Sequence, residues 1–201
     1  GTALAIFALT TIASSSSLVE AVCNNTKAIC VADEFIDFYN INDGRFYLGE
    51  PESTSTRNDH MLIQYFQKGR LELNIVSGHI RKGDAGLDLV QHRIPFSPGL
   101  IPENGPAHLY FPETGQSISF AFKDFYLFHD GFKQFGPPIS PEHDDGLSWS
   151  PSVQYFTKAR LEYHPDNIGT ADIVQIGNIG QELLQRSSRE AVKAPRNPLL
   201  Y

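Results

Sequence analysis

The side chains best suited to chemistry lie on a short alternating segment in the second half of the chain. Arg160 and Glu162 are two residues apart, so a strand would place both on one face. The same pair recurs as Arg70 and Glu72. Because it recurs, we expect a structural ion pair or cross-strand hydrogen bond, with orientation of a ligand as the alternative.

Aromatic residues surround this pair. Tyr155, Phe156, Tyr163 and His164 could form a platform on which a sugar ring stacks. The alternative is a hairpin that packs its aromatic side chains into a core. The residues that we consider for ligand binding are Tyr155, Tyr163, His164, Arg160 and Glu162.

No recognised catalytic motif is present. The sequence contains no Gly-x-Ser-x-Gly, no His-Glu-x-x-His, no phosphate-binding loop and no Cys-x-x-Cys. The densest acidic cluster contains Glu142, Asp144 and Asp145, which could hold calcium or form a solvated turn. We therefore expect no catalytic residue, no enzymatic activity, no cofactor and, calcium apart, no metal.

The composition narrows the class of protein. With 201 residues, 41% of them apolar and 11% aromatic, the chain can bury a core and is not wholly disordered. The net charge of −7 argues against a nucleic-acid-binding surface, which requires a basic face.

Two cysteines, Cys23 and Cys30, bracket a short polar loop. They follow a signal-like apolar stretch, which favours one disulfide formed in an oxidising compartment over free thiols or zinc ligands. Asn24 begins the single glycosylation sequon noted in this loop.

The apolar stretch near the start of the chain has about 11 strongly apolar residues, fewer than the roughly 20 of a spanning helix. It fits the middle of a secretory signal, although a basic leader is missing. Three roles remain open: a retained anchor, a segment packed on a neighbouring subunit, or a first core strand. The residues expected to mediate assembly or anchoring are Leu4, Ile6, Phe7, Leu9 and Ile12.

The rest of the chain shows an internal repeat. Asp-Phe-Tyr occurs at 37–39 and 124–126, Gln-Tyr-Phe at 64–66 and 154–156, and Arg-Leu-Glu at 70–72 and 160–162. The offset grows from 87 to 90 residues between these pairs, as expected for a duplication with loop insertions.

These patterns predict an α+β fold of two tandem repeats, each a helix, a turn, a β-hairpin and a helix. The first helix of each repeat is expected at 33–41 and 120–129, ending at Asp130-Gly131 in the second repeat, and the second hairpin at 153–163. The expected regions are 1–32 (apolar segment and Cys loop), 33–92 (repeat one), 93–116 (extended Pro-rich linker), 117–185 (repeat two) and 186–201 (basic tail).

The second repeat resembles a known class of modules. Phe-Gly-Pro-Pro-Ile-Ser at 135–140, Val-Gln-Tyr-Phe at 153–156, Ala-Arg-Leu-Glu-Tyr-His-Pro at 159–165 and Gly-Asn-Ile-Gly at 177–180 are similar to the LGFP repeats of secreted bacterial cell-wall proteins. The resemblance covers both repeats and is looser in the first. It implies binding or anchoring at a cell surface rather than catalysis.

We therefore expect a non-catalytic, extracytoplasmic binding or scaffolding protein associated with the cell wall or surface. Its expected partners are a protein, copies of itself or a cell-wall glycan, but no nucleic acid. The alternative is a structural subunit of a membrane complex or extracellular filament, in which the apolar N-terminal segment drives assembly or contacts a membrane.

Overall fold

The computed structural model describes residues 21–91, 105–150 and 152–193, apart from the side chains of 190–193. The fold is α+β, as predicted from the sequence. The first half contains β1 (Cys23–Asn24), β2 (Ile29–Cys30), α1 (Asp33–Ile41), α2 (Gly44–Tyr47), β3 (Thr56–Asn58), β4 (Met61–Phe66), β5 (Gly69–Asn74), β6 (His79–Lys82) and α3 (Ala85–Val90). The second half contains β7 (His108–Phe111), β8 (Gln116–Ser119), α4 (Phe120–Phe128), α5 (Gly131–Gln134), β9 (Ser152–Tyr155), β10 (Arg160–Tyr163), two 3₁₀ turns (Pro165–Asn167 and Ala171–Ile173), β11 (Val174–Ile176) and α6 (Ile179–Lys193).

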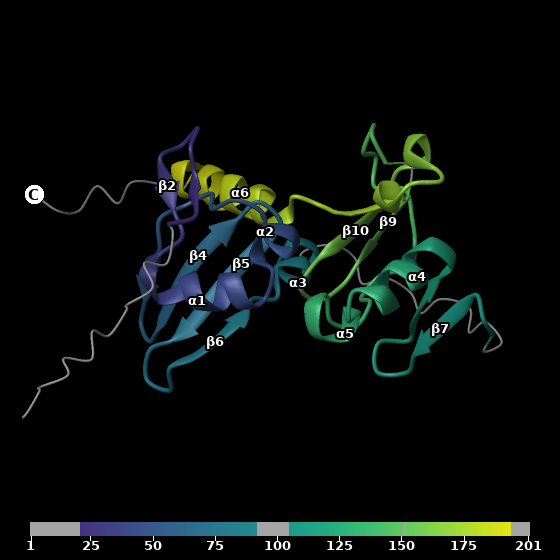
Figure 1. Cartoon of the computed structure of the whole chain (residues 1–201), viewed down its shortest axis with the longest axis horizontal. Helices are drawn as coiled ribbons and strands as arrows, with labels where there is room; N and C mark the ends of the chain where they lie inside the picture. The colour runs from purple at the N-terminus through teal and green to yellow at the C-terminus, as the bar shows by residue number, and fades with distance from the viewer. Residues whose placement is uncertain (1–20, 92–104, 151, 194–201) are drawn as a thin grey trace, which may run out of the picture.

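Each half is built around an antiparallel sheet (Figure 1). The strand order is β3-β4-β5-β6 in the first half and β9-β10-β11 in the second. The hairpins β4-β5 and β9-β10 match the sequence prediction, but β6 and β11 do not appear in it. Both strands are short and are followed directly by a glycine, Gly83 or Gly177, so only a brief alternating pattern marks them.

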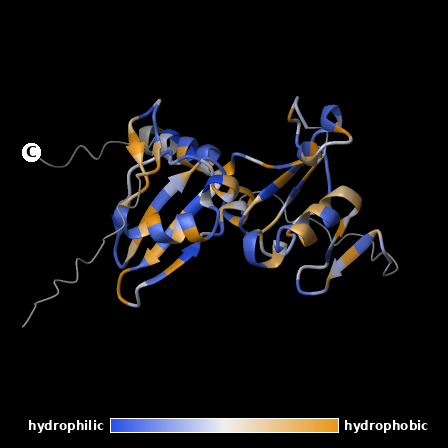
Figure 2. Cartoon of the chain, viewed as in Figure 1, coloured by the Kyte–Doolittle hydropathy of each residue, from blue (hydrophilic) through white to orange (hydrophobic). Residues whose placement is uncertain are grey.

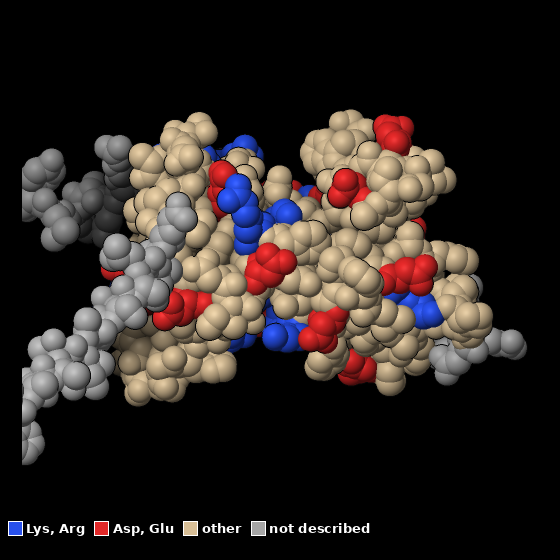
Figure 3. All heavy atoms as spheres, in the orientation of Figure 1, with Lys and Arg blue, Asp and Glu red and all other residues tan. Residues whose placement is uncertain are grey.

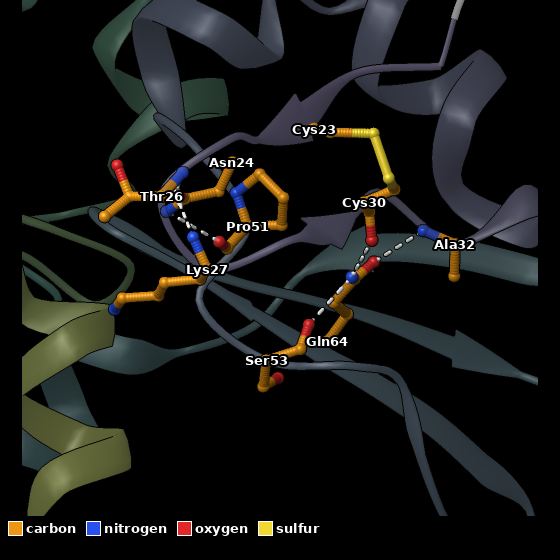
Figure 4. Close-up of a disulfide and its surroundings, with 9 residues drawn as sticks. All are labelled: Cys23, Asn24, Thr26, Lys27, Cys30, Ala32, Pro51, Ser53 and Gln64. Carbon is orange, nitrogen blue, oxygen red and sulfur yellow. Dashed lines mark hydrogen bonds between the residues drawn. A yellow bond between two sulfur atoms is a disulfide. The ribbon is translucent and has the colours of Figure 1, made fainter.

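A small hairpin begins each half and is fastened by a buried glutamine. Gln64 Nε2 donates hydrogen bonds to the carbonyl oxygens of Cys30 and Ser53, both at 2.9 Å. Figure 4 shows these contacts beside the Cys23–Cys30 disulfide. In the second half, Gln154 Nε2 donates in the same way to Ser117 and Ser140. The cysteine loop is therefore integrated with the first half.

Asn24 of the sequon is buried in this hairpin. Its Nδ2 donates to the Pro51 carbonyl at 3.3 Å, and its Oδ1 accepts from the backbone N–H groups of Thr26 and Lys27. Because Asn24 is only 4% exposed, a glycan on Nδ2 has little room, so this folded structure does not favour glycosylation there.

The helices α1 and α4 occupy the predicted spans, and each ends just before its Asp-Gly pair, but a second helix that was not predicted follows. Asp43 and Asp130 adopt left-handed backbone conformations, and each opens a second short helix, α2 or α5. The next position, 44 or 131, requires glycine because a Cβ there would come within 2.3 Å of the ring of Tyr39 or Tyr126. The expected helix stop is thus a tight corner between two helices.

The last helix of each half crosses to the other half. In α3, the Leu87 N–H donates to the Thr157 carbonyl in the β9-β10 turn at 3.0 Å. In α6, the N–H groups of Gly180 and Gln181 donate to the Gln67 carbonyl in the β4-β5 turn, each at 3.1 Å. Figure 1 shows α6 lying along the first half, although its sequence follows the second.

The buried side chains form three clusters that follow this exchange. One cluster belongs to the first half and includes Phe35 and Phe66, and another belongs to the second and includes Phe135 and Phe156. The third is shared, because Leu89 of α3 and Leu183 of α6 pack with Val153 and Tyr155 of β9. Two separately closed repeats, as the predicted boundaries imply, would not bury this shared cluster.

Two other predicted regions differ from the structure. The part of the predicted linker that the structure describes contains β7 and the start of β8, so it is a hairpin rather than an extended strap. The predicted basic tail is helical through Lys193, and its Arg186 donates to the Leu89 carbonyl at 3.0 Å.

The predicted assembly residues Leu4, Ile6, Phe7, Leu9 and Ile12 lie outside the described residues. Within the described part of the chain, no helix has both the length and the hydropathy needed to cross a membrane.

Candidate functional site

A groove of about 830 Å³ opens beside β11, the edge strand of the second sheet. Residues 171, 172 and 174–178 line it, and α4 contributes further residues. The aromatic and charged residues that line it are Phe46, Lys68, Phe125, Phe128, His129, Trp149, Glu162, His164 and Asp172. We refer to it as the aromatic groove.

Glu162 is the buried acid of the aromatic groove. Its Oε1 accepts a hydrogen bond from Arg160 Nη2 at 2.6 Å, and its Oε2 accepts one from Trp149 Nε1 at 3.0 Å. His164 Nε2 lies 3.5 Å from the same Oε2 and makes no hydrogen bond within the described protein. One carboxylate thus fixes the indole ring and lies beside a buried imidazole nitrogen.

The aromatic rings around this acid are unusually exposed. Trp149 is 56% exposed and Phe128 is 85% exposed, although rings of this size favour burial. Figure 2 shows the hydrophobic character of α4, from which Phe128 comes. A second depression of about 390 Å³ shares Phe125, Phe128 and His129 with the groove and extends the apolar surface along α4.

The first half completes the groove. The ring of Phe46 stacks on His129 with 4.9 Å between centroids, and the Tyr47 hydroxyl lies 3.2 Å from His129 Nδ1. Burial lowers the pKa of His129, with Asp43 opposing this effect, so the imidazole favours its neutral form. The contact between the halves therefore places a neutral ring beside the groove.

The five predicted ligand-binding residues separate into two groups. Glu162 and His164 line the groove, whereas Tyr163 lies on the opposite face of β10 and packs against the core of the second half. Tyr155 and Arg160 are fully buried, as is Phe156. Core packing, the alternative interpretation of this aromatic cluster, is therefore correct for Tyr155 and Phe156.

Arg160 is a structural residue that joins the sheet to α6. Its guanidinium contacts Glu162, Glu182 and the Tyr155 hydroxyl. Burial would lower the pKa of Arg160, but the hydrogen bond with Glu182 and the charge of Glu162 outweigh it and raise the pKa. Burial and the hydrogen bond to Asp145 raise the pKa of Tyr155 to about 12.

The acidic loop does not assemble calcium ligands. Glu142 accepts from Ser152 Oγ, Asp144 from the Gly146 N–H and Asp145 from the Tyr155 hydroxyl. Within the described ranges, no three His, Cys, Asp or Glu side chains converge as a metal site would require. The loop contributes Trp149 to the groove, which our sequence reasoning missed.

The corresponding acid of the first half, Glu72, has different partners. Glu72 on β5 is paired in register with Arg81 on β6, and Arg81 Nη2 lies 2.7 Å from Glu72 Oε2. In the second half, the partner of Glu162 across the strands is the neutral Gln175. Only Glu162 therefore directs its second oxygen toward an indole and an imidazole.

No protein-family model matches this chain, and no curated protein matches it either.

Proposed function

We propose that the chain is a non-catalytic glycan-binding module and that the aromatic groove holds the sugar. The observation that carries this proposal is the exposed Trp149 ring, whose N–H is fixed by a buried carboxylate at 3.0 Å. A ring held in place loses little conformational entropy when a ligand stacks on it.

The groove has the two kinds of surface that a sugar requires. Its exposed rings suit the apolar C–H face of a pyranose, and its polar atoms suit hydroxyl groups. Glu162 supplies an acceptor, and Asp172, Gln175 and Asn178 are further polar residues that line the groove. A volume of about 830 Å³ accommodates more than one sugar ring.

The same proposal includes the origin of the two halves. We infer that they are copies of one duplicated, LGFP-like module, joined through the proline-rich region and preceded by the apolar N-terminal segment. The equivalent pairs Gln64 and Gln154, and Arg70 and Arg160, support this, since they make matching contacts in the two halves. The disulfide supports an extracytoplasmic, cell-surface location.

One observation favours the structural-subunit alternative. Four large apolar side chains on and around α4 are exposed by more than half: Phe120, Leu127, Phe128 and Phe132. A surface of this kind suits contact with another protein or a further copy of the chain.

The single tryptophan makes the sugar proposal directly testable. Because the chain contains one Trp, its fluorescence reports on Trp149 alone. Titration with soluble N-acetylglucosamine oligomers should shift or quench this emission in a saturable manner. Phe128→Ala should weaken the Kd about fivefold, since stacking on one ring contributes on the order of 1 kcal/mol.

A second variant uses the first half as its template. Gln175→Arg would place a guanidinium opposite Glu162, as Arg81 lies opposite Glu72, and should compete with the indole for Oε2. Sugar binding should fall at least tenfold, whereas the matched control Arg81→Gln should leave it unchanged.

An unchanged emission spectrum with every oligomer, together with self-association that Phe132→Ser abolishes, would replace the glycan proposal with the structural-subunit alternative.

A further inference from the structure

A second, smaller pocket lies at the contact between the halves and has the opposite character. It has a volume of about 200 Å³ and shares no lining residue with the aromatic groove. Its charged lining residues are Arg81, Lys82, Lys133 and Lys158, with His79 beside them, and no carboxylate lines it. In the view of Figure 3, several Lys and Arg side chains lie near the middle of the face, where the two halves meet.

Two of these lysines converge on the end of one helix. Lys82 Nζ donates to the Gln134 carbonyl at 2.8 Å, and Lys158 Nζ donates to the Lys133 carbonyl at 3.1 Å. Both carbonyls belong to the last turn of α5, so this half-turn of backbone holds two ammonium groups close together. The negative end of a four-residue helix offsets only part of that charge.

Lys82 forms no ion pair with any described carboxylate. Its ammonium lies over the rings of Tyr47 and Phe135, 5.4 and 5.8 Å from their centroids. Burial, reinforced by the positive charges of Lys158 and Lys68, lowers the pKa of Lys82 to about 7. Arg81, by contrast, is already paired with Glu72 and Asp84.

We propose that this basic pocket binds an oxyanion, as a phosphate, sulfate or carboxylate group of a ligand, between Lys82 and Lys158. An anion there would supply the charge that the protein itself lacks and would accept hydrogen bonds from both ammonium groups. The site is small and open, so it fits one charged substituent rather than a sugar ring. This inference is independent of the glycan proposal, because the two sites have no residue in common.

Sulfate is the probe for the first test, because it does not titrate between pH 6 and 8.5. Its Kd, measured from amide shifts of β6 and α5 by NMR, should tighten about tenfold as the pH falls across this range and Lys82 gains its proton. Other titratable groups that face the pocket are His79 and Arg81 on β6, Lys133 on α5 and Lys158 in the β9-β10 turn. Replacing His79 by Gln should preserve the trend.

The variant Lys82→Ile separates binding from folding. The cross-strand partner of Leu161 in the second half is Ile176, which is buried, whereas the partner of Leu71 in the first half is Lys82. Isoleucine is therefore compatible with this place in the sheet, and near-UV circular dichroism should stay unchanged. The variant should lose at least tenfold in sulfate affinity, while Lys123→Met, which removes the same charge from α4, should bind as the parent does.

Two further probes identify the anion. Methyl phosphate that binds more tightly than methyl glucuronate would assign a phosphodiester or phosphomonoester polymer, and the reverse order would assign an acidic sugar. The proposal is overturned if sulfate causes no saturable shifts near β6 and α5, or if Lys82→Ile folds normally and binds sulfate with unchanged affinity.

Discussion

The two halves of this chain share a framework but differ at the acid on the central strand. In the first half, Glu72 has two arginine partners, Arg70 and Arg81, and its surroundings are fully charge-paired. In the second, Glu162 has one buried arginine, and its other oxygen meets an indole and an imidazole. One cross-strand residue therefore separates a closed ion-pair network from an open groove.

The difference extends to the two pockets. Phe46 and Ile176 line the aromatic groove near the contact between the halves. Near the same contact, Lys133 and Lys82 line the basic pocket. The comparison teaches that backbone geometry fixes where a pocket forms, while a few side chains decide which ligand it suits.

The largest expected effect breaks the exchange of helices on which both pockets depend. A Cβ at Gly86 would lie 2.0 Å from the Phe156 carbonyl oxygen, and one at Gly180 would lie 2.2 Å from that of Phe66. Gly86→Ala and Gly180→Ala should each lower the free energy of unfolding by about 3 kcal/mol in urea titrations. Gly146→Ala, in open space but at a φ of 72°, should cost about 1 kcal/mol; equal losses at all three would contradict tight helix contacts.

The next effect contrasts the two arginines. Arg160→Met leaves the buried Glu162 without a cation, apart from His164 when protonated, so we expect a loss of about 3 kcal/mol. Arg70→Met should lose only about 1 kcal/mol because Glu72 retains Arg81. Chemical denaturation of both variants checks this order. If the losses are equal, the second arginine of the first half does not substitute for the first.

A third prediction concerns the hairpins that begin each half. The strands β1 and β2 have two residues each and carry the disulfide, whereas β7 and β8 have four residues each. Replacing Cys23 and Cys30 together by Ser should cost about 2 kcal/mol, because a short closed loop no longer restricts the unfolded chain. Tm measured with and without reductant should fall in the parent and stay constant in the double variant.

The smallest expected effect is the pH dependence caused by Lys82. Its pKa is about 7 in the folded protein, below the 10.5 expected when unfolded, so the charged form opposes folding. The cost is fully present below pH 7 and is relieved as the pH rises from 7 to 10.5. Lys82→Ile should therefore raise Tm by about 3 °C at pH 6, with the gain vanishing near pH 10.5. A constant gain across this range would show that packing, not charge, is responsible.

The sequence predicts the individual helices and strands better than the way in which they assemble. The spans of α1 and α4 and the β4-β5 and β9-β10 hairpins follow from periodicity and turn residues, which act locally. The exchange of α3 and α6 does not follow from local patterns. Gly86 and Gly180 are compatible with a close approach, but the sequence does not show which backbone approaches them. The Asp-Gly pairs at 43–44 and 130–131 mark helix ends correctly, but they do not show that a second short helix follows each of them.

The candidate site was predictable only in part. Glu162 and His164 were identifiable because strand alternation places them on one face. The same rule also predicted Arg160 as a binding residue, although the fold buries it. Trp149 lies in an irregular loop with no periodicity, and its sole sequence signal is its rarity. Its relation to Glu162 is a contact across 13 residues that local patterns do not encode.

The exchange of the last helices also determines how the molecule can be tethered. The first described strand and α6 both lie on the first half, so the described part of the chain begins and ends on the same lobe (Figure 1). An attachment at either end would hold that lobe and leave the lobe with the groove projecting outward. Tension applied between the two ends would act across the first half, where α6 packs on β4 and β5, rather than across the second. The groove walls that the second half provides would thus keep their shape under such tension.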